Sequence, residues 1–152
     1  MNITVICIGS LKEKFFKDAC EEYIKRLSRF GKINVKELPE VQGSGSQDIE
    51  KEGKAIIKAI PSGSFVVPLC VEGKQLSSPA LAEKINSLGI NGVSEITFII
   101  GGSNGLSPEV KSLGNLKLSF SEMTFPHQLM RVILLEQVYR AFTIIAGTAY
   151  HK

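Results

Sequence analysis

Short apolar runs alternate with longer amphipathic segments along the whole 152-residue chain, and this alternation restricts the fold more than any other feature. The first run, residues 2–9 (NITVICIG), is nearly all apolar, which is typical of a strand buried on both faces of a sheet. Strands that alternate with helices predict a parallel sheet covered by helices on both faces, an α/β/α sandwich. The chain shows no repeat and no linker, so one domain over residues 1–152 is expected. The expected strands are residues 2–9, 33–38, 64–71, 95–100 and 116–120, and the expected helices are approximately residues 11–30, 47–60, 79–88, 108–113 and 127–146.

Local signals refine these boundaries. Ser10 and Glu13 have the spacing of a capping box at the start of the first helix. Ser78-Pro79 and Ser107-Pro108 each predict a helix start, with a serine cap followed by proline. Pro68 inside the third strand predicts either an edge position or a kink, because proline has no N–H for the ladder. Residues 41–46 (VQGSGS) are typical of a flexible surface loop.

Composition is that of an ordinary globular protein, with 43% hydrophobic and 22% charged residues. The net charge of +3 neither requires nor excludes a nucleic-acid partner. The three cysteines (Cys7, Cys20 and Cys70) show no CxxC spacing, which favours buried free thiols over a metal site or disulfides. No apolar run reaches the roughly 20 residues that span a bilayer, and the start lacks the basic residues of a signal peptide. A cytoplasmic protein without metal or membrane association is therefore expected.

Two turns rich in backbone groups, residues 101–105 (GGSNG) and 119–127 (SFSEMTFPH), each follow a strand and lead into a helix. Ligands bind at the carboxyl ends of strands in such sheets, and glycine allows close approach of the backbone. Together the turns predict a pocket for a nucleoside-like cofactor held by main-chain groups, with apolar Met123 and Phe125 against a purine. On this interpretation, valine at Gly101 blocks the pocket and leaves the fold intact. The alternative is two ordinary turns, and GGSNG does not match the dinucleotide fingerprint GxGxxG.

The last expected helix is apolar around most of its circumference, so it must be buried on more than one side. We expect one side to form a homodimer interface, with Ile133, Leu134 and Val138 facing outward. The alternative is a central helix covered on all sides within one chain.

Reactive side chains gather in the last quarter of the sequence. Arg131 and Arg140 lie on this apolar helix, so each needs an anion, either Glu136 or a phosphate. Tyr150 and His151 near the end combine a ring for stacking with an imidazole for proton transfer, although many chain ends have no role. The sequence has no HExxH or GxSxG pattern and no carboxylate cluster, which disfavours metalloenzymes and hydrolases.

Four segments identify a family. They are ITVICIGSLKEKFFKDACEEYIKRL at the start, FIIGGSNGLS, LSFSEMTFPHQLMRVILLEQVYRAF and the ending AYHK. Over its whole length the chain resembles the RlmH family of SPOUT methyltransferases. The resemblance implies an enzyme that uses S-adenosylmethionine to methylate N3 of a pseudouridine in a 23S rRNA stem-loop of the assembled ribosome. It also implies a homodimer and a deep trefoil knot near the C-terminus.

The resemblance and the two turns together give a set of expected site residues. The cofactor-binding residues are expected to be Leu69, Gly101, Gly102, Phe120, Ser121, Glu122, Met123, Thr124 and Phe125. His151 is the candidate base, Tyr150 is a candidate for contact with the flipped acceptor base, and Arg140 is a candidate to hold RNA phosphate or order the tail. The alternatives are a non-catalytic ribosome-binding or assembly factor with the same fold and a nucleotide-binding α/β protein such as a small reductase.

Overall fold

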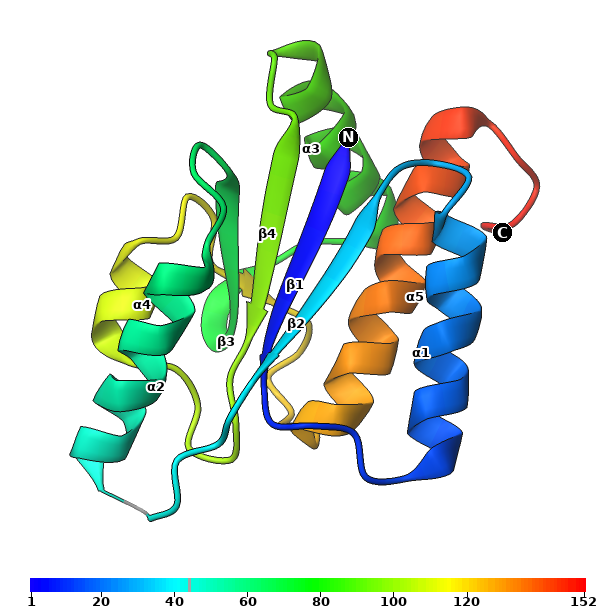
Figure 1. Ribbon diagram of the computed structural model, residues 1–152. Helices are drawn as coiled ribbons and strands as arrows, with labels where there is room; N and C mark the ends of the chain where they lie inside the picture. The colour runs from blue at the N-terminus through cyan, green and yellow to red at the C-terminus, as the bar shows by residue number, and fades with distance from the viewer. Residues whose placement is uncertain (44) are drawn as a thin grey trace.

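A five-stranded sheet, parallel throughout, forms the centre of the computed structural model, which describes residues 1–43 and 45–152 (Figure 1). The expected loop over residues 41–46 includes residue 44, which lies outside the described residues. The strands β1 (Asn2–Ile8), β2 (Ile33–Leu38), β3 (Phe65–Gln75), β4 (Glu95–Ile100) and β5 (Leu118–Ser119) follow the order β2-β1-β4-β3-β5. The helices are α1 (Lys14–Leu27), α2 (Ser46–Ala59), α3 (Ser78–Ile90), α4 (Pro108–Ser112) and α5 (His127–Ala146).

Helices cover both faces of the sheet, as the alternating pattern predicts. α1, α3 and α5 pack on one face, and α2 and α4 pack on the other (Figure 1). Successive side chains of β1 enter different cores, because neighbouring residues of a strand point to opposite faces. Ile3 and Val5 belong to the core with α1, α3 and α5, whereas Ile6 and Ile8 belong to the core with α2 and α4. The predicted α/β/α sandwich is confirmed.

Two helix starts differ from the sequence prediction. The capping box is wrong, because α1 begins at Lys14 and Glu13 makes no capping hydrogen bond through its side chain. Residues 10–13 instead cross from the end of β1 to α1, and the backbone N–H of Lys12 donates to Oε1 of Gln128 on α5 at 3.1 Å. The cap of α3 is Ser77, one residue earlier than predicted. The hydroxyl of Ser78 donates to Gln137 on α5 instead, at 2.6 Å.

Pro68 marks the place where β3 changes partner. β3 lies between β4 and β5, so the predicted edge position is wrong. Pro68 is the last residue of β3 in register with β4, opposite Ile99. Beyond it the strand pairs with β5, with an irregularity between Leu69 and Lys74, both of which pair with Leu118. A residue without an N–H therefore ends the pairing with β4, and the carboxyl ends of these strands separate.

α5 packs over the sheet between α1 and α3, and this position accounts for most of its apolar circumference (Figure 1). Leu134, Leu135 and Val138 have no exposed surface and belong to the core. The prediction that Leu134 and Val138 face outward is therefore wrong. Ile133, the third residue predicted to face outward, is half-buried. None of the helices in the described part of the chain is long and apolar enough to cross a membrane.

Candidate active site

A pocket of about 240 Å³ lies at the carboxyl ends of β3, β4 and β5. The glycine turn after β4 lines one side and the segment after β5 lines another, so the fold brings the two predicted turns together. Of the predicted cofactor-binding residues, Glu122 is exposed and does not line the pocket. The others do line it, namely Leu69, Gly101, Gly102, Phe120, Ser121, Met123, Thr124 and Phe125.

The glycine turn is shaped by close approach of the chain to itself. A Cβ on Gly101 would lie 2.7 Å from the carbonyl carbon of Gly105 and 2.8 Å from its oxygen. Gly105 has a φ of 79°, in the left-handed region that favours glycine, and its N–H donates to the carbonyl of Gly102 at 3.1 Å. A side chain at Gly101 would strike the backbone of the turn, which opposes the expectation that valine there leaves the fold intact. Blocking of the pocket by such a side chain stays a prediction.

Glu40, just beyond the end of β2, holds the turn from outside the pocket. Oε1 of Glu40 accepts a hydrogen bond from the hydroxyl of Ser103 at 2.7 Å. This bond, with smaller effects from the Ser103 backbone and the charge of His127, lowers the pKa of Glu40. His127, the first residue of α5, also lines the pocket. The sequence analysis missed Glu40; the signal was a carboxylate placed two residues after the end of β2, at the carboxyl ends of the strands.

The pocket wall is mainly apolar, with polar groups at the rim. Met123 is 73% exposed, although large apolar side chains usually avoid such positions in a loop. At the rim, Lys111 pairs with Glu72 at 2.5 Å. The half-buried Cys70 also lines the pocket, and burial raises the pKa of its thiol. Within the described residues, no cluster of three metal-ligating side chains occurs.

The other cysteines are core residues, as predicted for Cys7 and Cys20. Burial raises the pKa of Cys7 to about 12, so its thiol stays protonated near neutral pH.

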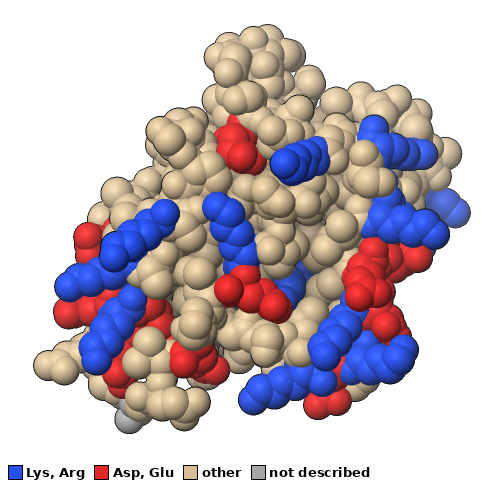
Figure 2. Space-filling model, in the orientation of Figure 1, with Lys and Arg blue, Asp and Glu red and all other residues tan. Residues whose placement is uncertain are grey.

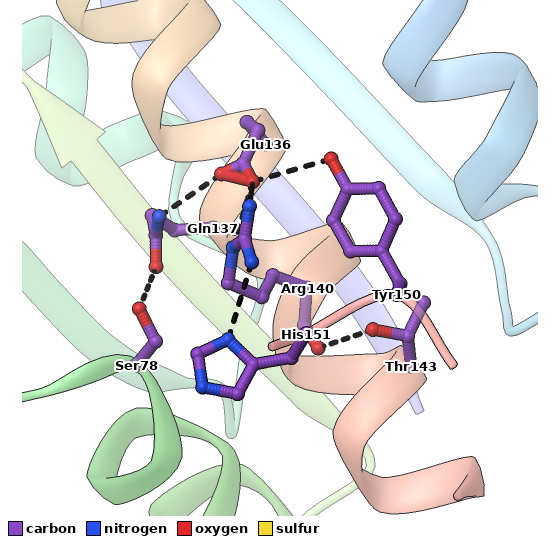
Figure 3. Close-up of polar contacts among 7 residues, drawn as sticks. All are labelled: Ser78, Glu136, Gln137, Arg140, Thr143, Tyr150 and His151. Carbon is purple, nitrogen blue, oxygen red and sulfur yellow. Dashed lines mark hydrogen bonds and ion pairs between the residues drawn. The ribbon is translucent and has the colours of Figure 1, made fainter. Parts of the chain in front are cut away.

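The C-terminal tail folds back onto α5 and forms a polar network around Glu136 (Figure 3). Nε and Nη2 of Arg140 contact Oε1 of Glu136 at 2.8 and 2.6 Å, so its partner is Glu136, one of the two anions that the sequence left open. The hydroxyl of Tyr150 donates to the same oxygen at 3.4 Å, and its ring packs edge-on against Tyr139 with centroids 4.8 Å apart. Burial and the nearby Glu136 raise the pKa of Tyr150.

His151 completes this network through its Nδ1 atom, which lies 3.1 Å from Nη1 of Arg140. A guanidinium only donates hydrogen bonds, so Nδ1 accepts and the N–H of the ring is on Nε2. Met130 on α5 lines the pocket, and Arg140 lies ten residues further along the helix, about 15 Å at 1.5 Å per residue. The tail and the pocket of one chain are thus separated.

Arg131 is a structural residue. It is 3% exposed, and its guanidinium pairs with Glu37 of β2 at 2.5 Å and donates to the carbonyl of Gly9 at 3.0 Å. The sequence correctly predicted that Arg131 needs an anion, but this anion is Glu37 and neither of the two that the sequence named. Glu136 pairs with Arg140, and an RNA phosphate cannot reach a side chain this buried. Nε of Arg131 has no hydrogen-bond partner among the described residues.

The fold and the site define an α/β protein with a largely apolar, backbone-rich pocket of the kind that holds a small molecule. Residues 1–151 match the model of a family described as a predicted SPOUT methyltransferase, and the chain belongs to this family.

Relatives of known name cover the full chain. The sequence is 51% identical to the putative ribosomal RNA large subunit methyltransferase H of Methanococcus maripaludis, over 100% of both chains. It is 53% identical to ribosomal RNA large subunit methyltransferase H of Bifidobacterium animalis subsp. lactis, again over 100% of both. A solved probable methylase family protein from Haemophilus influenzae matches 95% of this chain and 66% of its own, with a TM-score of 0.52 and 12% identity. That structure supports the fold alone, and the trefoil knot stays a prediction.

Proposed function

We propose that the protein uses S-adenosylmethionine to methylate N3 of a pseudouridine in a 23S rRNA stem-loop of the assembled ribosome, in the cytoplasm. The observation that carries the proposal is the pocket lined by the glycine turn and residues 119–125. Full-length relatives named as large-subunit rRNA methyltransferases support the substrate class.

The pocket suits a nucleoside bearing a sulfonium. Leu69, Phe120 and Phe125 offer apolar contacts for a purine, while the Gly101-Gly102 backbone approaches without side chains. Ser121 and Thr124 add hydroxyls. S-adenosylmethionine, when bound, supplies an already activated methyl group. The protein then has to exclude water, position the acceptor nitrogen and assist loss of its proton.

The tail is the candidate source of the groups that act on the acceptor. The lone pair of His151 Nδ1 is engaged by Arg140, so His151 becomes a base only when this contact opens. Nη1 of Arg140 is then available to the RNA or to a deprotonated base, while Nε and Nη2 stay paired with Glu136. The ring of Tyr150, which already packs on Tyr139, is suited to contact a flipped base.

We further propose a two-fold dimer in which the tail of one chain approaches the pocket of the other. A groove of about 320 Å³ between α3 and α5 has an apolar lining that includes Leu76, Leu81 and Ile133. Phe120 and Phe125 line both this groove and the pocket, so a partner bound in the groove lies beside the cofactor site. The separation of tail and pocket within one chain favours this arrangement.

The test is transfer of radiolabelled methyl from S-adenosylmethionine to ribosomes from cells that lack the protein, followed by mapping of the modified nucleotide. Calorimetry with S-adenosylmethionine, S-adenosylhomocysteine and NADH accompanies it. Binding of the first two compounds and methylation of one pseudouridine support the proposal. Ribosome binding without cofactor binding identifies an assembly factor, and binding of NADH alone identifies a reductase.

A further inference from the structure

Arginines and aromatic rings form one connected cluster where α1 ends beside the tail. The guanidinium of Arg26 lies 5.3 Å from the ring centre of Tyr23 and 5.7 Å from that of Tyr139. Arg29 lies 4.5 Å from the ring centre of Phe30. On the tail side, Arg140 lies 4.7 Å from the ring centre of Tyr150, which packs on Tyr139. We call these seven residues the arginine cluster.

The arginines at the end of α1 are exposed and ordered by the rings. Arg26 pairs with Glu22 at 2.7 Å, but Arg29 makes no ion pair with any carboxylate in the described part of the chain. A guanidinium that lies on a ring keeps its N–H edge available, and less side-chain freedom is lost when that edge binds an anion. Basic side chains lie above acidic ones at the upper right of the molecule, and others lie at its left and lower right (Figure 2).

We propose that Arg26 and Arg29 bind backbone phosphates of the rRNA next to the nucleotide that the tail contacts. This inference rests on the proposed function, since it takes rRNA as the substrate. Arginine is suited to phosphate because its planar fork donates two hydrogen bonds at once. The cluster joins α1 to Tyr150 and the tail, so an RNA strand that reaches the tail also passes the end of α1. A one-domain protein of net charge +3 has little surface for binding RNA, and the arginine cluster supplies some of it.

Cations at the C-terminal end of a helix also stabilise the helix itself, and this is the competing explanation. The discriminating variant is Arg26→Gln with Arg29→Gln. Its matched control is Lys54→Gln with Lys58→Gln on α2, which removes the same charge from exposed positions on the opposite face of the sheet. A third variant, Arg26→Lys with Arg29→Lys, keeps the charge and removes the planar fork.

The measurements are ribosome affinity by co-sedimentation at several salt concentrations, methyl transfer, cofactor binding by calorimetry, and thermal unfolding. For the arginine-to-glutamine pair, we expect the ribosome Kd to rise about tenfold and the salt dependence to weaken by about one unit of log–log slope per lost contact. The KM for ribosomes should rise with the Kd, while kcat at saturating ribosomes and cofactor affinity stay at wild-type values. The lysine pair should fall between wild type and the glutamine pair.

The inference is overturned if the arginine-to-glutamine pair and the α2 control show the same ribosome affinity and the same salt dependence. The proposed function is unaffected by that result. A lower melting temperature with unchanged ribosome affinity also overturns it, in favour of a role in helix stability. Wild-type protein that binds no ribosomes overturns both proposals. Wild-type protein that binds ribosomes without transferring methyl overturns the enzymatic proposal alone, because the affinity comparison still tests the cluster.

Discussion

Gly101→Ala tests whether the glycine turn shapes the cofactor pocket. The added Cβ would lie 2.7 Å from the carbonyl carbon of Gly105, whereas ordinary contacts begin at 3.4 Å, so the atoms must separate by about 0.7 Å. The obstacle is backbone and cannot rotate away, and Leu106 Cδ2 lies only 3.1 Å from the same Cβ. The turn therefore has to shift, and Gly102 and Gly105, which line the pocket, shift with it.

The size of the effect follows from this displacement. Overpacking of this kind costs about 1–3 kcal/mol of folding free energy, which in a chain of this length lowers Tm by roughly 3–9 °C. We expect cofactor affinity to fall by about ten- to a hundredfold, since main-chain contacts made by the displaced turn are lost, and about 1.4 kcal/mol corresponds to each factor of ten. The assays are calorimetry with S-adenosylmethionine and thermal unfolding of the same preparation.

The matched control is Gly89→Ala near the end of α3. Its Cβ meets only the flexible tip of Met1, at 3.5 Å, and a helical Gly→Ala change usually stabilises by about 0.5–1 kcal/mol. This variant should bind the cofactor normally and melt no lower than wild type. Wild-type affinity and Tm in Gly101→Ala would refute the steric reasoning. An unchanged Tm with reduced cofactor affinity would instead mean that the turn shifts at little cost in stability and that the substitution affects only cofactor binding.

Four further perturbations test other parts of the account. Deletion of residues 149–152 should leave folding and calorimetric cofactor binding nearly intact and abolish methyl transfer; full activity would exclude a role for the tail. Ile133→Arg places a charge in the groove beside α3 and should give monomers in analytical ultracentrifugation at micromolar concentration, and a dimeric variant would put the interface elsewhere. Glu37→Ala leaves the buried Arg131 guanidinium without its carboxylate and should lower the free energy of unfolding by about 2 kcal/mol, measured by chemical denaturation. The loss is smaller than for a fully buried pair because the Glu37 side chain is 43% exposed. Adding Arg131→Met should recover part of it. The pKa of Glu40 is lower in the folded protein than its ordinary value of 4.5, so the ionised carboxylate stabilises the fold at any pH above 4.5. This stabilisation is lost as the pH falls through the folded-state pKa. Glu40→Gln should therefore flatten the acidic limb of a plot of Tm against pH.

The parallel sheet was predictable because nearly every residue of β1 is apolar and each of its two side-chain sets is buried in a separate core. The pocket was predictable for a related reason, since the carboxyl ends of parallel strands meet at one edge. The shift of β3 from β4 to β5 was not readable, because Pro68 reports only a missing donor and not which neighbour the strand pairs with next.

Ion pairs between residues close in sequence could be predicted, whereas pairs between distant residues could not. The Arg140–Glu136 pair was predictable from its four-residue spacing on a helix, whereas the Arg131–Glu37 pair joins residues 94 positions apart. Glu40 was missed for this reason, since its partner Ser103 lies 63 residues away. The outward face of α5 was misjudged because an apolar helix surface does not reveal how many neighbours cover it.

The position of α5 between α1 and α3 also governs the order in which the protein can acquire its structure during synthesis. The first helix made, α1, packs against the last one, α5, so the larger core stays open until that helix has been translated. Such dependence on contacts distant in sequence slows folding and leaves a nascent chain with exposed apolar surface. The pocket has the same requirement, because its lining runs from Leu69 to Met130. Cofactor capture therefore requires a chain that has been translated at least through Met130, and shorter chains have an incomplete pocket.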